Sequence, residues 1–167
     1  MKKVIKVLFV CHGNICRSTM AQCFFAWLCA ENGLSEFFEI DSAATSREEI
    51  GNGPHRGTVK TLKKYNISLI PHTARQMTLS DAAYYDLLIG MDDENMWGMK
   101  RITKGKYTSK MHKLLEFTAQ GTLKSARDVD DPWYSGNFEQ TYADVSSGCA
   151  NLLEYCIKNY GILHADA

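Results

Sequence analysis

The chain has 167 residues, of which 45% are hydrophobic and only three are prolines, so it fits a single compact domain over residues 1–167. Its 19 basic and 19 acidic side chains cancel, which argues against a nucleic-acid partner or an acidic membrane surface, because both favour a basic protein. No apolar stretch approaches the roughly 18–20 residues that a membrane helix needs, so we expect no membrane partner.

The first predicted element is a buried strand at residues 4–10, an apolar run broken only by Lys6. With Lys2 and Lys3 ahead of it, the run imitates the start of a signal peptide. However, Lys6 interrupts the apolar stretch and no small-residue cleavage site follows. We therefore predict a cytoplasmic protein, and we expect it to be a monomer.

A short loop, residues 11–17, joins this strand to a predicted helix and reads Cys-His-Gly-Asn-Ile-Cys-Arg. Such a loop points successive backbone N–H groups inward, and the helix adds its positive N-terminal end, so the loop can cradle a phosphate. The Arg17 guanidinium can hold two phosphate oxygens, while Cys11 lies at the other end of the loop. The same positive field favours a thiolate at Cys11, and the loop predicts nucleophilic attack on phosphorus.

The rest of the chain alternates strands and helices. We predict a helix at 18–32, with Ser18 and Thr19 at capping positions and Gly33 at its end. Further strands are predicted at residues 38–42, 86–91 and 113–117, and further helices at 57–65, at 78–85 and from about 92. An acidic and aromatic loop is expected at 128–137, followed by a long helix with one apolar stripe from Phe138 to Cys156.

This alternation predicts an α/β fold: a single domain with a four-stranded parallel twisted sheet and helices on both faces. Ligands bind outside the carboxyl ends of the strands in such folds, which is where Cys11 would lie. Four further cysteines fall in apolar helical patterns and are interpreted as buried hydrophobic residues: Cys23, Cys29, Cys149 and Cys156.

Cleavage of a phosphate ester also needs a proton donor for the leaving oxygen. The best candidate is Asp131 in the acidic loop, because Pro132 stiffens the backbone beside it and two aromatic residues follow. Asp128 and Asp130 compete for this role.

These two motifs resemble the low-molecular-weight protein tyrosine phosphatases. The family signature is a cysteine, five residues and an arginine near the N-terminus, with Asp-Pro and aromatic residues near the C-terminus, as in residues 10–18 and 131–134 here. Other stretches resemble family landmarks in the expected order: residues 41–44, His72, residues 74–76, Met91-Asp92 and Asn95. The resemblance covers nearly the whole chain and implies the phosphotyrosine phosphatase I fold.

The resemblance assigns a role to each matching residue. Cys11 would be the nucleophile, Arg17 the phosphate clamp and Asp131 the general acid in a two-step hydrolysis through a cysteinyl-phosphate. Substrate or phosphate would contact His12, Gly13, Asn14, Ile15, Cys16, Ser18, Trp133 and Tyr134. Ser42 and His72 would brace Asn14, and no cofactor or metal is implied. The substrate would be a phosphotyrosine-containing protein or a small aryl phosphate.

The chain departs from the family at several positions. Thr19 stands where proline is frequent, Trp133 stands where many members have tyrosine, and residues 48–50 lack the large aromatic that lines the pocket in some members. Ile15 stands where related protein-arginine phosphatases have threonine, which favours an aryl phosphate. Cys16 shares the loop with Cys11, and we hypothesise a reversible disulfide between them that protects the nucleophile from further oxidation.

Two other classes stay open at this point, and a zinc site is a weaker alternative. A thioredoxin-coupled arsenate reductase shares this fold but needs an additional cysteine pair around residues 82–89, where no cysteine occurs. A cysteine phosphocarrier would need neither Arg17 nor Asp131. A zinc site at Cys11, His12 and Cys16 lacks the usual ligand spacing and a second ligand pair.

Overall fold

A computed structural model describes residues 3–162 of the chain. Its centre is one parallel sheet in the strand order β2-β1-β3-β4. The strands are β1 (Ile5–Cys11), β2 (Phe38–Ala44), β3 (Leu87–Gly90) and β4 (Met111–Lys113). The sheet confirms the predicted four-stranded parallel architecture.

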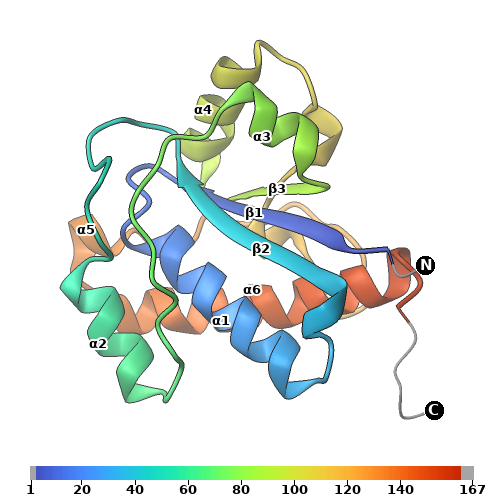
Figure 1. The fold of residues 1–167 in the computed structure, drawn as a ribbon, viewed down its shortest axis with the longest axis horizontal. Helices are drawn as coiled ribbons and strands as arrows, with labels where there is room; N and C mark the ends of the chain where they lie inside the picture. Colours follow the sequence, from blue (N-terminus) through green and yellow to red (C-terminus); the bar gives the residue numbers. More distant parts are fainter. Residues whose placement is uncertain (1–2, 163–167) are drawn as a thin grey trace.

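Helices cover both faces of this sheet (Figure 1). One layer holds α1 (Arg17–Glu31) and α6 (Phe138–Asn159), with α2 (Arg56–Lys64) beside them. The opposite layer holds α3 (Leu79–Tyr84) and α4 (Asp93–Thr103), while the four-residue helix α5 (Pro132–Ser135) lies near the start of α2. Three short 3-10 helices span Ser35–Phe37, Thr108–Lys110 and Leu114–Glu116.

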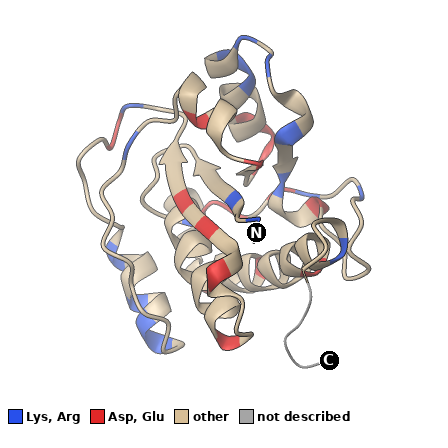
Figure 2. Ribbon diagram, turned by 45° about the vertical axis from the view of Figure 1, so that its right-hand side comes forward, with Lys and Arg blue, Asp and Glu red and all other residues tan. Residues whose placement is uncertain are grey.

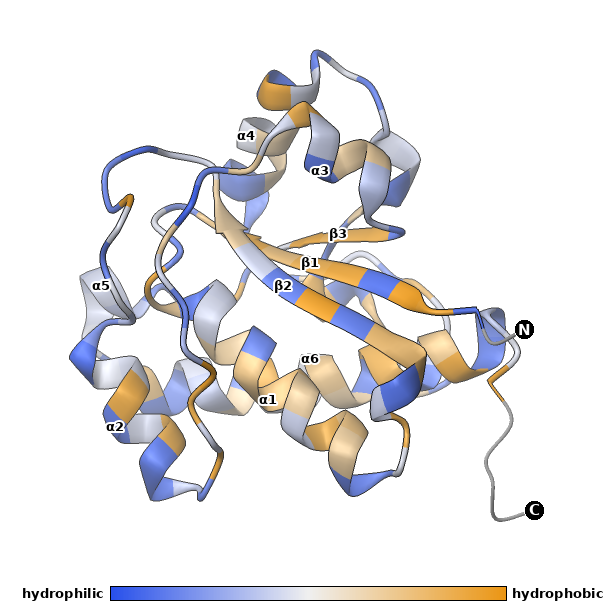
Figure 3. Cartoon of the chain, viewed as in Figure 1, coloured by the Kyte–Doolittle hydropathy of each residue, from blue (hydrophilic) through white to orange (hydrophobic). Residues whose placement is uncertain are grey.

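The side chains of β1 alternate between two cores, because successive residues of a strand point to opposite faces. Val7 and Phe9 pack toward α1 and α6, whereas Leu8 and Val10 pack toward α3 and α4. All four are fully buried, and Figure 3 shows β1 and β3 as largely hydrophobic strands between the helical layers. A strand buried on both faces gives the nearly continuous apolar run seen in the sequence.

The predicted caps of α1 were wrong. The helix begins at Arg17 after Cys16, which makes no side-chain cap, while the Thr19 hydroxyl donates to the Asn14 carbonyl and Ser18 faces Cys11. Both hydroxyls therefore serve the loop rather than the helix end. The C-terminal prediction holds, since Gly33 has a φ of 67° and closes α1.

The fourth strand was also misplaced. It spans Met111–Lys113, and the chain then turns into the 3-10 helix at Leu114–Glu116. The turn arises because the Lys113 N–H donates to the Glu116 carboxylate at 3.0 Å. Leu114 is fully buried, and its side chain lies directly over Gly148 of α6, where a Cβ atom would be only 2.6 Å from it.

Charges of both signs are spread over the fold (Figure 2), with basic residues along α2 and acidic residues on β2. Within the part of the chain that the structure describes, no helix is long and apolar enough to cross a membrane. All six cysteines are buried free thiols, and the four assigned to the core lie in it as predicted.

Candidate active site

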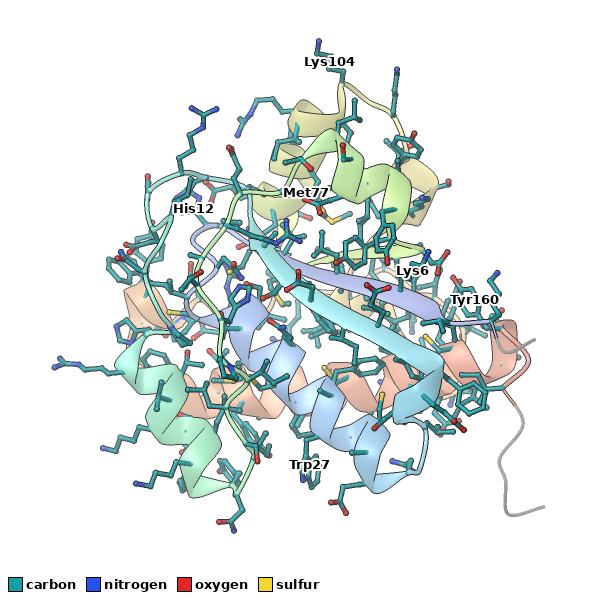
Figure 4. The ribbon with its side chains drawn as sticks, in the orientation of Figure 1. Lys6, His12, Trp27, Met77, Lys104 and Tyr160 are labelled. Carbon is teal, nitrogen blue, oxygen red and sulfur yellow. The ribbon has the colours of Figure 1, made fainter. Side chains whose placement is uncertain are left out.

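The loop between β1 and α1 lies at the carboxyl end of the sheet, where β1 ends at Cys11 and α1 begins at Arg17. His12, labelled in Figure 4, belongs to this loop and is only half-buried. The sequence forms the turn here because the backbone of Asn14 is left-handed, with a φ of 61°. Asparagine tolerates this conformation better than most residues.

The Asn14 side chain is the centre of a buried hydrogen-bond network. Its Nδ2 donates to the Ser18 hydroxyl at 2.8 Å and to the Ser42 hydroxyl at 2.9 Å. Its Oδ1 lies 2.7 Å from His72 Nε2 and accepts the Arg75 backbone N–H at 3.2 Å. The network ties the loop to β2 and to the segment before α3, so the loop geometry is fixed by residues far apart in the sequence.

The network ends at the sulfur of Cys11. Ser18 Oγ lies 3.0 Å from Cys11 Sγ, and the Asn14 backbone N–H donates to the same sulfur at 3.3 Å. Because Ser18 already accepts a hydrogen bond from Asn14, its own proton is free to point at the sulfur. Both contacts bring a hydrogen-bond donor to the sulfur.

The guanidinium of Arg17 is buried beside this sulfur, with 2% of the residue exposed. Its Nη1 donates to Asp92 at 2.8 Å and to the Val129 carbonyl at 3.1 Å, and its Nη2 donates to Asp131 at 3.2 Å. Burial alone would lower the pKa of Arg17, but Cys11, Asp92 and Asp131 together raise it above its usual value. Arg17 is therefore a permanent, oriented cation.

Asp131 is the member of the acidic segment that reaches the Cys11 loop. One of its carboxylate oxygens accepts from Arg17, and the other caps α5 by accepting the Trp133 N–H at 3.1 Å. Its two competitors point elsewhere. Asp128 pairs with Lys113 at 3.0 Å, and Asp130 accepts from the Ser135 hydroxyl at 2.7 Å.

A cavity of about 250 Å³, called here the Cys11 pocket, opens above the loop. It is lined by Cys11, His12, Gly13, Ile15, Cys16, Arg17, Glu48, Glu49, Glu94, Asp131, Trp133 and Tyr134. Trp133 and Tyr134 are 57% and 85% exposed, so they form an open wall. Asn14 and Ser18 are buried and are not among the residues that line the pocket, and their predicted contact with phosphate stays a prediction.

Two titratable groups around the pocket are shifted by burial. Burial, together with the smaller effect of the neighbouring Cys11, raises the pKa of the Cys16 thiol to about 12, so Cys16 is neutral at physiological pH. Burial also lowers the pKa of His72, which therefore donates from a neutral ring to Asn14. The disulfide between Cys11 and Cys16 stays a prediction.

Several neighbours of the site had no role in the sequence analysis. Asp92 was noted as part of a stretch that resembles a family landmark but was given no role, yet it anchors Arg17 and also caps α4 by accepting the Asn95 N–H at 2.7 Å. Gln22 Oε1 accepts a hydrogen bond from the Ser42 hydroxyl at 2.5 Å. The position of Asp92 at the carboxyl end of a parallel strand was the available signal. Within residues 3–162 no cluster of three His, Cys, Asp or Glu side chains could hold a metal.

Comparison with known proteins agrees with this geometry. Residues 6–160 match the family described as low molecular weight phosphotyrosine protein phosphatase. The low molecular weight protein-tyrosine-phosphatase YfkJ of Bacillus subtilis is 41% identical over 150 residues, covering 90% of this chain and 94% of the relative. The corresponding protein PtpA of Staphylococcus epidermidis is 36% identical, covering 93% and 96%.

Solved structures give the same result. The crystal structure of YfkJ superposes with a TM-score of 0.87 at 39% identity, covering 93% of this chain and 96% of that one. The structure of SP-PTP from Streptococcus pyogenes, a low molecular weight protein tyrosine phosphatase, gives a TM-score of 0.82 at 36% identity and covers 96% and 99%.

Proposed function

Because the chain belongs to the low molecular weight phosphotyrosine protein phosphatase family, we propose that it hydrolyses phosphotyrosine monoesters with Cys11 as nucleophile, Arg17 as phosphate clamp and Asp131 as general acid. The observation that carries this proposal is the convergence of three groups on one pocket. A hydrogen-bonded sulfur lies at its base, and a buried guanidinium and a carboxylate lie beside it.

The loop binds the phosphoryl group first. The backbone N–H groups of residues 12–17 and the N-terminal end of α1 supply positive potential, and α1 starts without a side-chain cap that would compete for them. Arg17 contributes its guanidinium, which Asp92 and Val129 hold in place through Nη1. The phosphate then takes the position beside Nη2, and this displaces the Asp131 carboxylate toward the leaving oxygen.

In the first step the Cys11 thiolate attacks phosphorus, and a sulfur–phosphorus bond forms while the bond to the tyrosine oxygen breaks. Asp131, in its protonated form, donates its proton to that oxygen, so tyrosine leaves as a neutral phenol. The oxygens of the transferring group carry the developing negative charge, which Arg17 and the loop N–H groups stabilise.

In the second step water attacks the cysteinyl-phosphate. The Asp131 carboxylate accepts a proton from this water, the sulfur–phosphorus bond breaks, and inorganic phosphate and the Cys11 thiolate are released. Ser18, 3.0 Å from the sulfur, stabilises the departing thiolate by a hydrogen bond. Asn14 keeps that hydroxyl oriented.

The alternatives use less of this site. A cysteine phosphocarrier has no need for a carboxylate beside Arg17, and an arsenate reductase would need the second cysteine pair that the sequence lacks around residues 82–89. We further propose a cytoplasmic location, supported by six buried free thiols, which a reducing compartment preserves. The monomeric state stays a prediction.

The test compares the wild type with Cys11→Ser in a buffer containing a metal chelator. We expect the wild type to release phosphate from phosphotyrosine and a rapid quench to trap one phosphoryl group on Cys11. Cys11→Ser should lose at least ~10⁴-fold in kcat because a serine hydroxyl is a far weaker nucleophile at neutral pH. Equal rates for the two proteins would refute the mechanism.

A further inference from the structure

The mouth of the Cys11 pocket carries three glutamates whose charges the proposed chemistry does not use. Glu48 and Glu49 lie in the loop that follows β2, and Glu94 lies in the first turn of α4. They line the pocket from two different segments of the chain, so the negative charge surrounds the path by which a substrate reaches the loop.

Two of these glutamates are held in place over the catalytic loop. Glu48 is 3.0 Å from His12 Nε2, and its side chain is still 70% exposed. Glu49 accepts the Asn52 side-chain amide at 2.6 Å, and its Cγ lies 3.3 Å from the position that a Cβ atom would take on Gly13. Their carboxylates therefore face the mouth rather than moving freely in solvent.

Glu94 carries a charge at the mouth, and so does Glu49, whose hydrogen-bond partner is the neutral Asn52 amide. Among the residues that the structure describes, no cation pairs with Glu94, whereas its neighbour Asp93 pairs with Lys113 at 3.1 Å. The one Arg or Lys among the residues that line the pocket is Arg17, which Asp92 and Asp131 already hold. A cation supplied from outside would be attracted to Glu94.

Trp97 adds a second feature beside Glu94. It lies three residues further along α4, so the two side chains share one face of the helix. Trp97 is 74% exposed, which is unusual for so large an aromatic residue. A carboxylate beside an open indole ring is a good receptor for Lys or Arg, because the ammonium or guanidinium group can pair with the acid while it lies over the ring.

We propose that this mouth selects phosphotyrosine that is flanked by Lys or Arg in the substrate protein. The inference rests on the proposed function and names the substrate class of the same pocket. The phosphate enters the positive loop, while the flanking cation meets Glu94 and Trp97 on one side or Glu48 and Glu49 on the other. An acidic flanking residue is repelled by the same groups.

The experiment uses three phosphotyrosine peptides that differ only in the residues on each side of the phosphotyrosine: Lys, Gln or Glu. We measure kcat/KM for phosphate release by the wild-type protein at low and high salt. At low salt we expect the Lys peptide to exceed the Glu peptide by on the order of tenfold, with Gln between them. High salt should reduce the difference, since exposed charges are screened.

Variants then assign the preference to the mouth. Glu94→Gln should lower the Lys-to-Glu ratio by about threefold, the size expected for one exposed charge pair, and Trp97→Ala should lower kcat/KM mainly for the Lys peptide. Glu31→Gln is the matched control, because Glu31 is an exposed glutamate at the opposite end of α1 from the loop. It should keep the wild-type ratio.

Equal kcat/KM for the three peptides, or a preference for Glu, would overturn the inference. It is also overturned if the combined variant Glu48→Gln, Glu49→Gln and Glu94→Gln keeps the full preference for Lys. Each variant is judged by a ratio of peptides, so a partial loss of folded protein does not affect the result. Failure of the proposed function is separate, because the wild type would then release no phosphate from phosphotyrosine itself.

Discussion

Two regions meet at the Cys11 pocket, and they are built in opposite ways. Most of the loop from Cys11 to Ser18 is buried, with Asn14 at 1% and Arg17 at 2% exposure, and the side chains of Asn14 and Arg17 each make several hydrogen bonds. The segment with α5 is open, since Trp133 and Tyr134 are mostly exposed. Asp131 connects that segment to the loop through Arg17, and Trp133 contacts the His55 ring.

The difference separates two tasks. A phosphoryl group has the same shape in every substrate, so a rigid, preorganised loop stabilises it best. Leaving groups and their protein surroundings vary, so the residues that meet them can lie on an adaptable surface. Changes in the loop should therefore affect every substrate, whereas changes in the α5 segment should depend on the substrate.

After the change of the nucleophile itself, the largest effect is expected for Arg17→Lys. Lysine keeps the positive charge but loses the planar arrangement of donors that serves Asp92, Val129 and the phosphate together. We expect a loss of about 10³-fold in kcat/KM, similar for all aryl phosphates. A loss that varies strongly with the leaving group would contradict the assignment of Arg17 to phosphate binding.

Asp131→Asn should have the next largest effect. Asparagine can still cap α5, but it cannot donate a carboxylic proton to the leaving oxygen. We expect kcat/KM, which reports on the first step, to fall by about 10²-fold for phenyl phosphate and much less for p-nitrophenyl phosphate, whose leaving group departs without a proton. The measurement is a plot of kcat/KM against the pKa of the leaving group for both proteins. Equal losses for both substrates would contradict the role of Asp131 as the general acid. Asp130→Asn is the matched control.

Gly57→Ala tests how the α5 segment is supported. A Cβ atom on Gly57 would lie 2.3–2.7 Å from atoms of the Phe138 ring. That ring stacks on His55 at 5.2 Å, and His55 in turn meets Trp133 at 6.0 Å. Because the stacked rings leave no space for the added methyl group, we expect a loss of about 1–3 kcal/mol in the free energy of unfolding, measured by urea denaturation.

Gly53→Ala is the control for this substitution, because a Cβ atom on Gly53 meets nothing within 4 Å. If both alanine variants are equally stable, the stack does not constrain the segment.

The smallest effect concerns the support of the loop by His72. Burial lowers its pKa in the folded protein, and Arg75 lowers it further although Asp41 acts in the opposite direction. As pH falls below about 6.5, the unfolded chain binds a proton that folded His72 resists, so the stabilising contribution is present above this pH and is lost below it. The loss from this residue should stay below about 1 kcal/mol.

Urea unfolding of the wild type and His72→Gln at pH 7.5 and 5.5 measures this loss. Glutamine can still donate to Asn14, so the variant should fold while its stability depends less on pH. Part of the dependence should remain, because burial also lowers the pKa of His112. An unchanged dependence in the variant would contradict the role given to His72.

Local patterns were enough to predict the sheet, because β1 and β3 are apolar runs that both faces of the sheet bury. The errors came where a side chain bonds to an adjoining loop or turn instead of to the end of a regular element. Ser18 and Thr19 have the residue types of helix caps, but the Ser18 hydroxyl bonds to Cys11 and Asn14, and the Thr19 hydroxyl donates to the Asn14 carbonyl. The last strand ends early because Glu116 accepts the Lys113 N–H.

The candidate site could be predicted only where its residues belong to local motifs. Candidate roles for Cys11, Arg17 and Asp131 could be predicted from the sequence, because the loop is a local motif and Asp131 lies beside Pro132. The contact of Asp92 with Arg17 could not be predicted from the sequence, because the two residues are 75 positions apart. Glu94 and Trp97 were missed for a similar reason, since only the fold brings the start of α4 to the mouth of the pocket.

The two carboxylates that hold Arg17 also bear on turnover. Asp92 and Asp131 both pair with the guanidinium, so in the proposed reaction an incoming phosphate would replace the Asp131 carboxylate instead of meeting an unpaired positive charge. After hydrolysis Asp131 would compete with inorganic phosphate for Nη2. This competition would keep the affinity of the site for inorganic phosphate moderate, which favours fast release of the product.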